Sequence, residues 1–210
     1  MPMGQLGGVL RIDVAEQSID LLAIAGHKGL LGPTGTGGLY VAPGVRLTPL
    51  RQGGTGTRSE HLSQPEEMPD ALEAGTVNTV GIAGLGAALR VLQSTGIEVV
   101  RARESALTAR LVTGLREIDG VTVHGPADPS QRVAVVSVTL RGWEPVDVSA
   151  ALDSAFGIAV RAGLHCAPLA HRTLGTFPRG TVRLAPGCST TDDQIDQTLA
   201  ALRELALSAR

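Results

Sequence analysis

Hydrophobic and polar positions follow two different spacings in the first 95 residues. Residues 19–24 and 38–41 are short apolar runs, and a glycine-rich segment separates them. Short apolar runs bounded by glycine are typical of buried strands. From position 80 onward, small and apolar residues recur every three to four positions, so the spacing predicts a helix over residues 80–92.

The remainder of the chain predicts alternating helices and strands. The break at Ser94, Thr95 and Gly96 indicates a domain boundary after residue 95. Beyond it the pattern predicts helices over residues 100–118, 146–156 and 190–205, and strands over 121–124, 133–140, 158–160 and 181–184. Thr190 and Asp193 have the spacing of a helix capping box. This order indicates an α+β domain with helices packed on a largely antiparallel sheet.

The segment between the second apolar run and the first helix lacks periodicity. Residues 42–72 are rich in Gly, Pro, Thr and Ser, and so long an excursion is usually functional or disordered. Thr76 and Asn78 stand just before the predicted helix, where either side chain could cap its exposed amides.

Composition narrows the class of protein. The chain has 210 residues, 43% of them hydrophobic, which is enough to bury a core as one domain or two small ones. A formal net charge of -2 gives no electrostatic argument for nucleic acid, and no apolar run reaches the roughly 18 residues of a membrane span. The N-terminus lacks signal-peptide features, so we expect a cytoplasmic protein whose two cysteines, Cys166 and Cys188, are free thiols.

Lys28 is the first candidate for chemistry, because it lies in the glycine-rich segment between the two apolar runs. Near a core, burial disfavours the charged form of a lysine and leaves an amine able to form a Schiff base with an aldehyde. The alternative is a lysine at the end of a strand whose ammonium group reaches water.

Four motifs follow one another along the chain. They are AGHKGLLGPTGTGGLY at 25–40, GGTGT at 53–57 leading to EAGTVNT at 73–79, VRAGLHCAPLAH at 160–171, and GTVRL at 180–184. In content and order these motifs resemble the class V aminotransferase family, and specifically its cysteine desulfurase branch, which uses pyridoxal phosphate (PLP). The resemblance extends through essentially the whole chain.

The resemblance implies an α/β protein of the fold type I class of PLP-dependent transferases. Residues 1–95 would be the C-terminal part of the PLP-binding large domain, and residues 96–210 a small α+β C-terminal domain. The family's first half has no counterpart upstream of these motifs, so we expect a family member that lacks its N-terminal half.

The resemblance also implies a set of cofactor-binding residues. Lys28 would be the Schiff-base lysine, and His27 would contact the cofactor phosphate. Gln5 matches a glutamine that contacts the phenolic oxygen, whereas Pro2 occupies the position of an aspartate that pairs with the pyridine nitrogen. Thr76 resembles a threonine that reaches the phosphate of the partner subunit, which implies a homodimer with shared sites.

The last two motifs supply the residues implied to act on the substrate. Cys166 would be the nucleophile that carries a persulfide to an acceptor, its thiolate favoured by neighbouring Arg161 and His165; the alternative is a small buried hydrophobe. Arg183 would bind the substrate α-carboxylate, and otherwise would face solvent. Arg161 either lines the site or holds the loop.

No metal site is expected, because His61, His124 and His171 have no further ligands at metal-binding spacing. We expect these three histidines at the surface, with His171 bordering the site.

The resemblance therefore implies a PLP-dependent enzyme that moves sulfur from L-cysteine to Cys166 and releases alanine. Three other class V activities remain open, namely aminotransferase, lyase and selenocysteine lyase. A truncated, non-catalytic fragment that needs a missing N-terminal half is a further alternative, favoured by Pro2 at the aspartate position.

Overall fold

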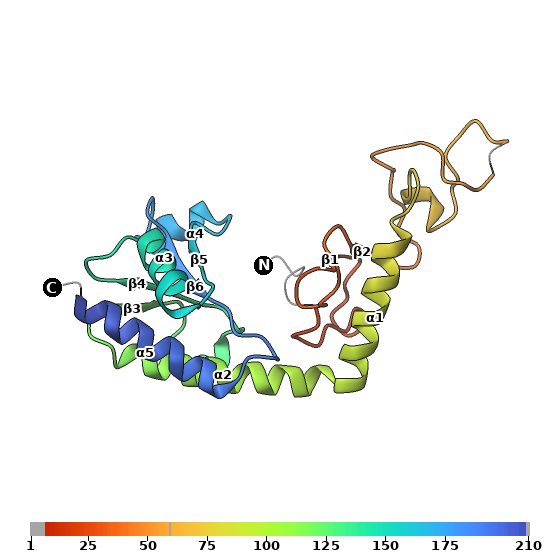
Figure 1. Ribbon diagram of the computed structural model, residues 1–210. Helices are drawn as coiled ribbons and strands as arrows, with labels where there is room; N and C mark the ends of the chain where they lie inside the picture. The colour runs from red at the N-terminus through yellow and green to blue at the C-terminus, as the bar shows by residue number, and fades with distance from the viewer. Residues whose placement is uncertain (1–6, 59, 209–210) are drawn as a thin grey trace. The chain divides into compact units, whose positions relative to one another are not determined.

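The computed structural model describes residues 7–58 and 60–208, and Figure 1 shows their secondary structure. The chain divides into two compact units, Met1–Val100 and Arg101–Arg210, which we call the first unit and the second unit. The assignment of residues 1–95 to a cofactor domain and of 96–210 to a small domain stays a prediction.

A β-hairpin carries the glycine-rich segment of the first unit. Strands β1 (Leu21–Ala25) and β2 (Gly37–Val41) pair in an antiparallel register in which Leu21 lies opposite Val41. The two strands lie close to the predicted positions, but the prediction that the first is buried is wrong. Leu21 of β1 is 46% exposed and the other four residues of the strand are exposed or half-buried, because this sheet has only two strands among the described residues.

Helix α1 (Thr79–Thr95) follows a long irregular segment, as the sequence predicts. Of the two candidate caps, Asn78 is the N-cap, because its side chain accepts a hydrogen bond of 3.0 Å from the Gly81 amide. Within the described residues of the preceding segment, the one regular element is the short 3₁₀ helix η2 (Asp70–Leu72). Its Asp70 carboxylate accepts a hydrogen bond of 3.0 Å from the Thr57 hydroxyl.

The second unit contains a four-stranded sheet covered by helices. Its elements are α2 (Ile97–Arg116), which begins before the division between the units, β3 (Val121–His124), η3 (Pro129–Gln131), β4 (Val136–Leu140), α3 (Pro145–Phe156), β5 (Arg161–Gly163), α4 (Pro168–Thr173), β6 (Thr181–Leu184) and α5 (Asp192–Ser208). The strand order is β3-β4-β6-β5, and every neighbouring pair is antiparallel. The predicted α+β architecture with an antiparallel sheet is therefore confirmed.

One predicted strand is misplaced. We expected a strand over residues 158–160, but β5 begins at Arg161. Ile158 and Val160 are apolar because they pack against the core at the approach to the sheet, and not because they pair with a neighbouring strand.

Alternation along the strands separates an apolar face of the sheet from a polar one. Val136, Val138 and Leu140 of β4 are buried, with Ser137 and Thr139 between them. The core formed on the apolar face includes Leu107, Leu111 and Leu115 of α2, Val182 and Leu184 of β6, and Leu199 and Leu202 of α5. The opposite face carries Thr122, His124, Ser137, Thr139, Thr181 and Arg183.

A capping box starts helix α5, one residue later than predicted. The Gln194 amide donates to the Thr191 hydroxyl at 3.2 Å, and the Thr191 amide donates to the Gln194 side chain at 3.0 Å. The predicted box of Thr190 and Asp193 is wrong, because α5 begins at Asp192 and Thr191 is therefore its N-cap. The Thr190 hydroxyl instead accepts a hydrogen bond from the Gly187 amide at 3.0 Å.

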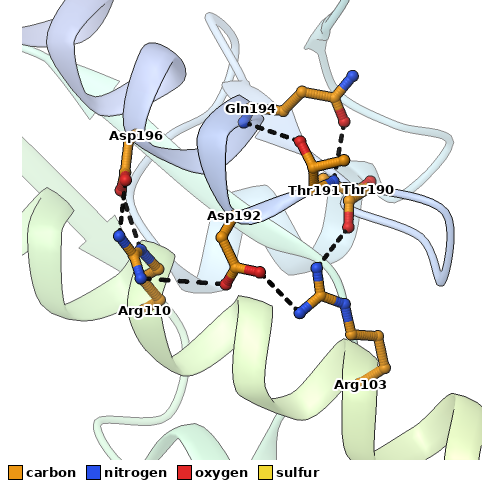
Figure 2. A network of polar contacts seen from close by, with 7 residues as sticks. All are labelled: Arg103, Arg110, Thr190, Thr191, Asp192, Gln194 and Asp196. Atoms are coloured by element: carbon orange, nitrogen blue, oxygen red, sulfur yellow. Dashed lines mark hydrogen bonds and ion pairs between the residues drawn. The ribbon is translucent and has the colours of Figure 1, made fainter.

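Two arginines of α2 connect that helix to the start of α5 (Figure 2). Arg103 pairs with Asp192 at 2.9 Å and donates to the Thr190 carbonyl at 2.9 Å, while Arg110 pairs with Asp196 at 2.6 Å. Because these side chains are substantially exposed and solvent screens their charges, each pair contributes little to the stability of the fold. They fix the register of the two helices rather than supply the stability of the core.

Within the described residues, no single helix is both long and apolar enough to cross a membrane. Helices α1 and α2, taken together across the break at Gly96, meet that criterion by length and composition alone.

The β5–β6 pair depends on two glycines that approach closely. Gly163 lies opposite Thr181 in the register, and Gly180 precedes that threonine with a φ of +81°. A Cβ atom added to Gly180 would overlap the carbonyl group of Gly163. Only glycine satisfies both the left-handed backbone and the lack of space.

We therefore expect Gly180→Ala to lower the free energy of unfolding more than Gly175→Ala does. Gly175 also has a positive φ of 72° but has open space around its Cβ position, so it isolates the backbone penalty of about 1–2 kcal/mol. Overpacking should add about 1–3 kcal/mol at Gly180. Urea unfolding followed by the fluorescence of Trp143, the single tryptophan and part of the second unit, measures both; equal effects would contradict the steric argument.

Candidate active site

In the first unit, Lys28 and His27 lie in the turn that follows β1, and both residues are exposed. Three backbone hydrogen bonds close this loop: the Leu31 amide donates to the Lys28 carbonyl, Gly32 to Gly26, and Gly26 to Thr36, at 2.8–2.9 Å. The Lys28 side chain itself is exposed, although Gly26 and Leu30 of the same loop are buried.

The same loop packs against the N-terminal part of α1. A Cβ atom added to Gly81 would lie 2.8 Å from Cγ2 of Thr36, so helix and loop are in close contact. Thr76, which is exposed, stands three residues before α1. The first unit thus holds the lysine loop against a helix start, where free amides favour an anion. Gln5 and Pro2 lie outside the described residues.

In the second unit, the β5–β6 pairing brings two arginines together. Arg161 and Arg183 are direct partners in the register. Nε of Arg183 is buried and has no hydrogen-bond partner among the described residues. A buried guanidinium donor without an acceptor is costly, so this atom marks a place suited to an anionic ligand.

Cys166 lies in the turn between β5 and α4, and its side chain is exposed. His165 and Cys166 are two consecutive non-glycine residues in the left-handed region, with φ values of 50° and 61°. Each such residue costs about 1–3 kcal/mol, which contacts with the surrounding structure must offset. Nη2 of Arg161 lies 3.9 Å from Sγ of Cys166 and is the cation beside the thiol.

His165 connects the Cys166 turn to β6. Its Nε2 lies 3.1 Å from the Thr181 carbonyl oxygen and 3.3 Å from the Thr181 hydroxyl. Burial, followed by the charge of Arg183, lowers the pKa of His165, so the ring is neutral at pH 7 and Nε2–H donates to the carbonyl. A neutral ring adds no positive charge, and any electrostatic support of a Cys166 thiolate therefore comes from Arg161.

The prediction of surface histidines is wrong for His171. Its side chain is only 5% exposed, and its Nδ1 lies 2.7 Å from the Thr176 hydroxyl. His124 is partly buried and bonds the Thr139 hydroxyl at 3.0 Å, whereas His61 is exposed. The sequence analysis did expect His171 at the border of the site, and its ring centroid lies 5.9 Å from that of His165. Its burial was not predicted, because the short helix α4 that carries it was not among the predicted elements.

Among residues 7–58 and 60–208, no group of three or more His, Cys, Asp or Glu side chains could hold a metal ion. The residues present do fit part of a PLP site. Lys28 offers an exposed primary amine for an aldehyde, and its sequence neighbour His27 and Thr76, three residues before α1, are exposed and available to a phosphate.

The chain thus joins a unit with a lysine in a glycine-rich loop to an antiparallel α+β unit with an exposed cysteine turn, and its likeness to solved cysteine desulfurases makes it part of a fold type I transferase. The family model "Aminotransferase class-V" matches residues 3–198. The chain belongs to the class V aminotransferase family.

Three individual proteins illustrate the similarity. A probable cysteine desulfurase of Methanothermobacter thermautotrophicus is 36% identical over 95% of this chain and 50% of its own length. A probable cysteine desulfurase of Mycolicibacterium paratuberculosis is 40% identical over 93% of this chain and 28% of its own. The apo structure of a cysteine desulfurase from Thermococcus onnurineus gives a TM-score of 0.83, with 31% identity over 98% of this chain and 51% of that one. The chain spans about half the length, or less, of the relatives it matches.

The lowered pKa values of His165 and His124, both due first to burial, predict a pH dependence of stability. An unfolded histidine titrates near 6.5, so just below that pH the unfolded chain binds more protons and the free energy of unfolding decreases. We expect Trp143-monitored urea unfolding to give a lower value at about pH 5.5 than at about pH 7.5. The difference in free energy of unfolding between the two pH values should shrink in the double variant His165→Gln/His124→Gln. An unchanged difference would show that these two histidines are not its cause.

Proposed function

We propose that this protein is a PLP-dependent cysteine desulfurase, which moves sulfur from L-cysteine to Cys166 and releases alanine. The observation that carries the proposal is the arrangement in the second unit. Nε of Arg183, on the strand paired with β5, is buried without an acceptor among the described residues, and an exposed cysteine lies in the turn that follows β5. The relatives named as cysteine desulfurases support the same chemistry.

Arg183 would bind the carboxylate of the amino-acid substrate. Its Nε lacks an acceptor among the described residues, and a carboxylate supplies one in the planar geometry that suits a guanidinium group. β6 is held by β4 on one side and β5 on the other, so the guanidinium group projects from a rigid strand. A fixed carboxylate in turn fixes the direction of the substrate side chain.

Cys166 would act as the nucleophile. Its thiolate attacks the sulfur of L-cysteine, an S–S bond forms, and the carbon–sulfur bond breaks with its electron pair left on carbon. After that carbon gains a proton, the products are alanine and a persulfide on Cys166, so atoms and electrons balance without an added oxidant. Arg161, 3.9 Å from Sγ, is placed to stabilise the sulfur anion at either stage. The exposed turn then offers the persulfide to an acceptor.

The first unit would hold the cofactor. Lys28 would bind PLP through its amine, and His27 would donate a hydrogen bond to the phosphate. When bound, PLP supplies an electron sink for the carbon that loses sulfur. By family resemblance, Thr76 would serve the partner subunit of a homodimer.

Binding of PLP should depend on its phosphate group. Lys28 is the only lysine of the chain, so borohydride reduction after incubation with PLP and peptide mass mapping will distinguish it from the N-terminal amine. We expect Lys28 to be half-labelled by PLP at about tenfold lower concentration than by pyridoxal, since each lost phosphate contact weakens binding. His27→Ala/Thr76→Ala should narrow that gap, and Lys28→Arg should abolish the adduct. Equal labelling by both aldehydes would indicate non-specific reaction with an exposed amine.

The two cysteines provide a matched pair for the catalytic role. We expect Cys166→Ser to reduce alanine formation from L-cysteine by about a hundredfold or more, because a hydroxyl group is a far weaker nucleophile toward sulfur. Cys188→Ser, in a turn before α5, should retain near-normal activity. Equal activity of the Cys166 variant would refute the nucleophile assignment, and a keto acid in place of alanine would indicate an aminotransferase.

A further inference from the structure

The backbone around Cys166 adopts a conformation that its own residues do not favour. Neither His165 nor Cys166 is glycine, yet both have positive φ values, of 50° and 61°. The turn is closed by one backbone hydrogen bond, from the Ala167 amide to the Leu164 carbonyl at 2.8 Å. A left-handed pair of this kind persists only where surrounding contacts enforce it.

Two side chains next to the Cys166 turn, those of Arg161 and His165, make polar contacts that could hold it. The two contacts differ in how far they are exposed to solvent. Arg161 is exposed, and its contact with Sγ of Cys166 is long at 3.9 Å. The His165 ring, in contrast, contacts the carbonyl oxygen and the hydroxyl of Thr181, a residue with no exposed surface. A hydrogen bond to a fully buried strand residue is the firmer anchor, because water does not compete for it.

A second histidine supports the first. His171 is 95% buried, bonds the Thr176 hydroxyl at 2.7 Å, and places its ring 5.9 Å from the His165 ring at an interplanar angle of 44°. The Thr176 amide also donates to the His171 carbonyl at 2.9 Å, so α4 and the segment after it are tied together. The His165 ring is therefore confined between β6 and a buried, hydrogen-bonded neighbour.

The ring's remaining nitrogen shows how His165 acts. With Nε2–H donating to Thr181, Nδ1 of the neutral ring is an acceptor, and it is buried without a partner among the described residues. In the part of the chain that the structure describes, no hydrogen bond joins the His165 ring to the Cys166 thiol. Any effect of His165 on the thiol therefore passes through the backbone of the turn and not through proton transfer.

We propose that His165 is the positioning residue of the Cys166 turn: by binding Thr181, it holds the left-handed conformation that presents the thiol to solvent. The importance of this position for catalysis rests on the proposed desulfurase function, whereas the conformational role does not.

The conformational role can be measured directly by hydrogen exchange of the Ala167 amide, which closes the turn. We expect His165→Ala to accelerate this exchange by about tenfold. His165→Gln should restore slow exchange, because its Nε2 stands at the same number of bonds from the backbone and can donate to the Thr181 carbonyl. His165→Leu, which fills similar space but has no hydrogen-bond donor, should behave like the alanine variant and provides a second test if His165→Ala fails to fold.

A matched control lies on the same face of the sheet. His124 is also partly buried and also bonds a threonine hydroxyl, but on β3 and β4 rather than at the cysteine turn. His124→Ala should remove a contact of the same kind while leaving Ala167 exchange unchanged. Accelerated exchange in this control would show that any loss of stability opens the turn, and would overturn the specific role of His165.

Steady-state desulfuration then tests the consequence for Cys166. We expect His165→Ala to lower kcat by about tenfold with little change in KM for L-cysteine, because Arg183 still binds the carboxylate while the nucleophile is displaced. His165→Gln should recover most of kcat. A rise in KM with unchanged kcat would overturn the positioning role in catalysis.

The two proposals fail separately. Unchanged Ala167 exchange in His165→Ala overturns the positioning proposal whatever the activity. Absence of desulfuration in the unaltered protein counts against the proposed function, and the exchange measurement still decides whether His165 holds the turn.

Discussion

The antiparallel pairing of β5 with β6 is the interaction on which the candidate site of the second unit depends. It places Arg161 opposite Arg183 and Gly163 opposite Thr181. The close approach of Gly163 and Gly180 lets the short strand dock, and Thr181 then offers the carbonyl oxygen that binds His165. Without this pairing, neither arginine has a fixed position and the cysteine turn has no buried anchor.

Strand alternation lets β6 serve stability and chemistry at once. Val182 and Leu184 point into the core, where both are at most 4% exposed, while Thr181 and Arg183 belong to the opposite, polar face. The free energy gained by burying Val182 and Leu184 offsets the cost of burying the polar groups of Thr181 and Arg183. A rigid strand of this kind suits a residue that must orient a carboxylate.

Among the described residues, three buried side-chain polar atoms lack a hydrogen-bond partner, and two of them, on Arg183 and His165, lie at the β5–β6 site, whereas the third is Nη2 of Arg132. Nε of Arg183 and Nδ1 of His165 are both buried and both lack partners among the described residues, yet their surroundings are otherwise well bonded. Native proteins rarely leave such groups unsatisfied except where a ligand or water binds or where function needs them. Together with the strained turn at Cys166, they distinguish this face from an ordinary solvated surface of a sheet.

Local patterns in the sequence were enough for the α+β architecture and most of its helices. Apolar periodicity depends on neighbours three to four residues apart, so α1, α2, α3 and α5 could be located without any knowledge of the fold. Two predicted boundaries were wrong: Thr191 rather than Thr190 caps α5, and the strand expected at 158–160 begins at Arg161. In both places the deciding contacts come from pairing and packing that the local pattern does not contain.

The motifs alone also singled out Lys28, Cys166, Arg161 and Arg183, because their residue types and order resemble a known family. Only the tertiary structure decided their surroundings. It exposed Lys28, buried His171, and joined His165 to Thr181 across sixteen positions of sequence. Hydrogen bonds between residues distant in sequence, and burial set by the packing of whole elements, leave no periodic signal along the chain. For this reason the reactive residues could be predicted from the sequence, whereas the contacts that position them could not.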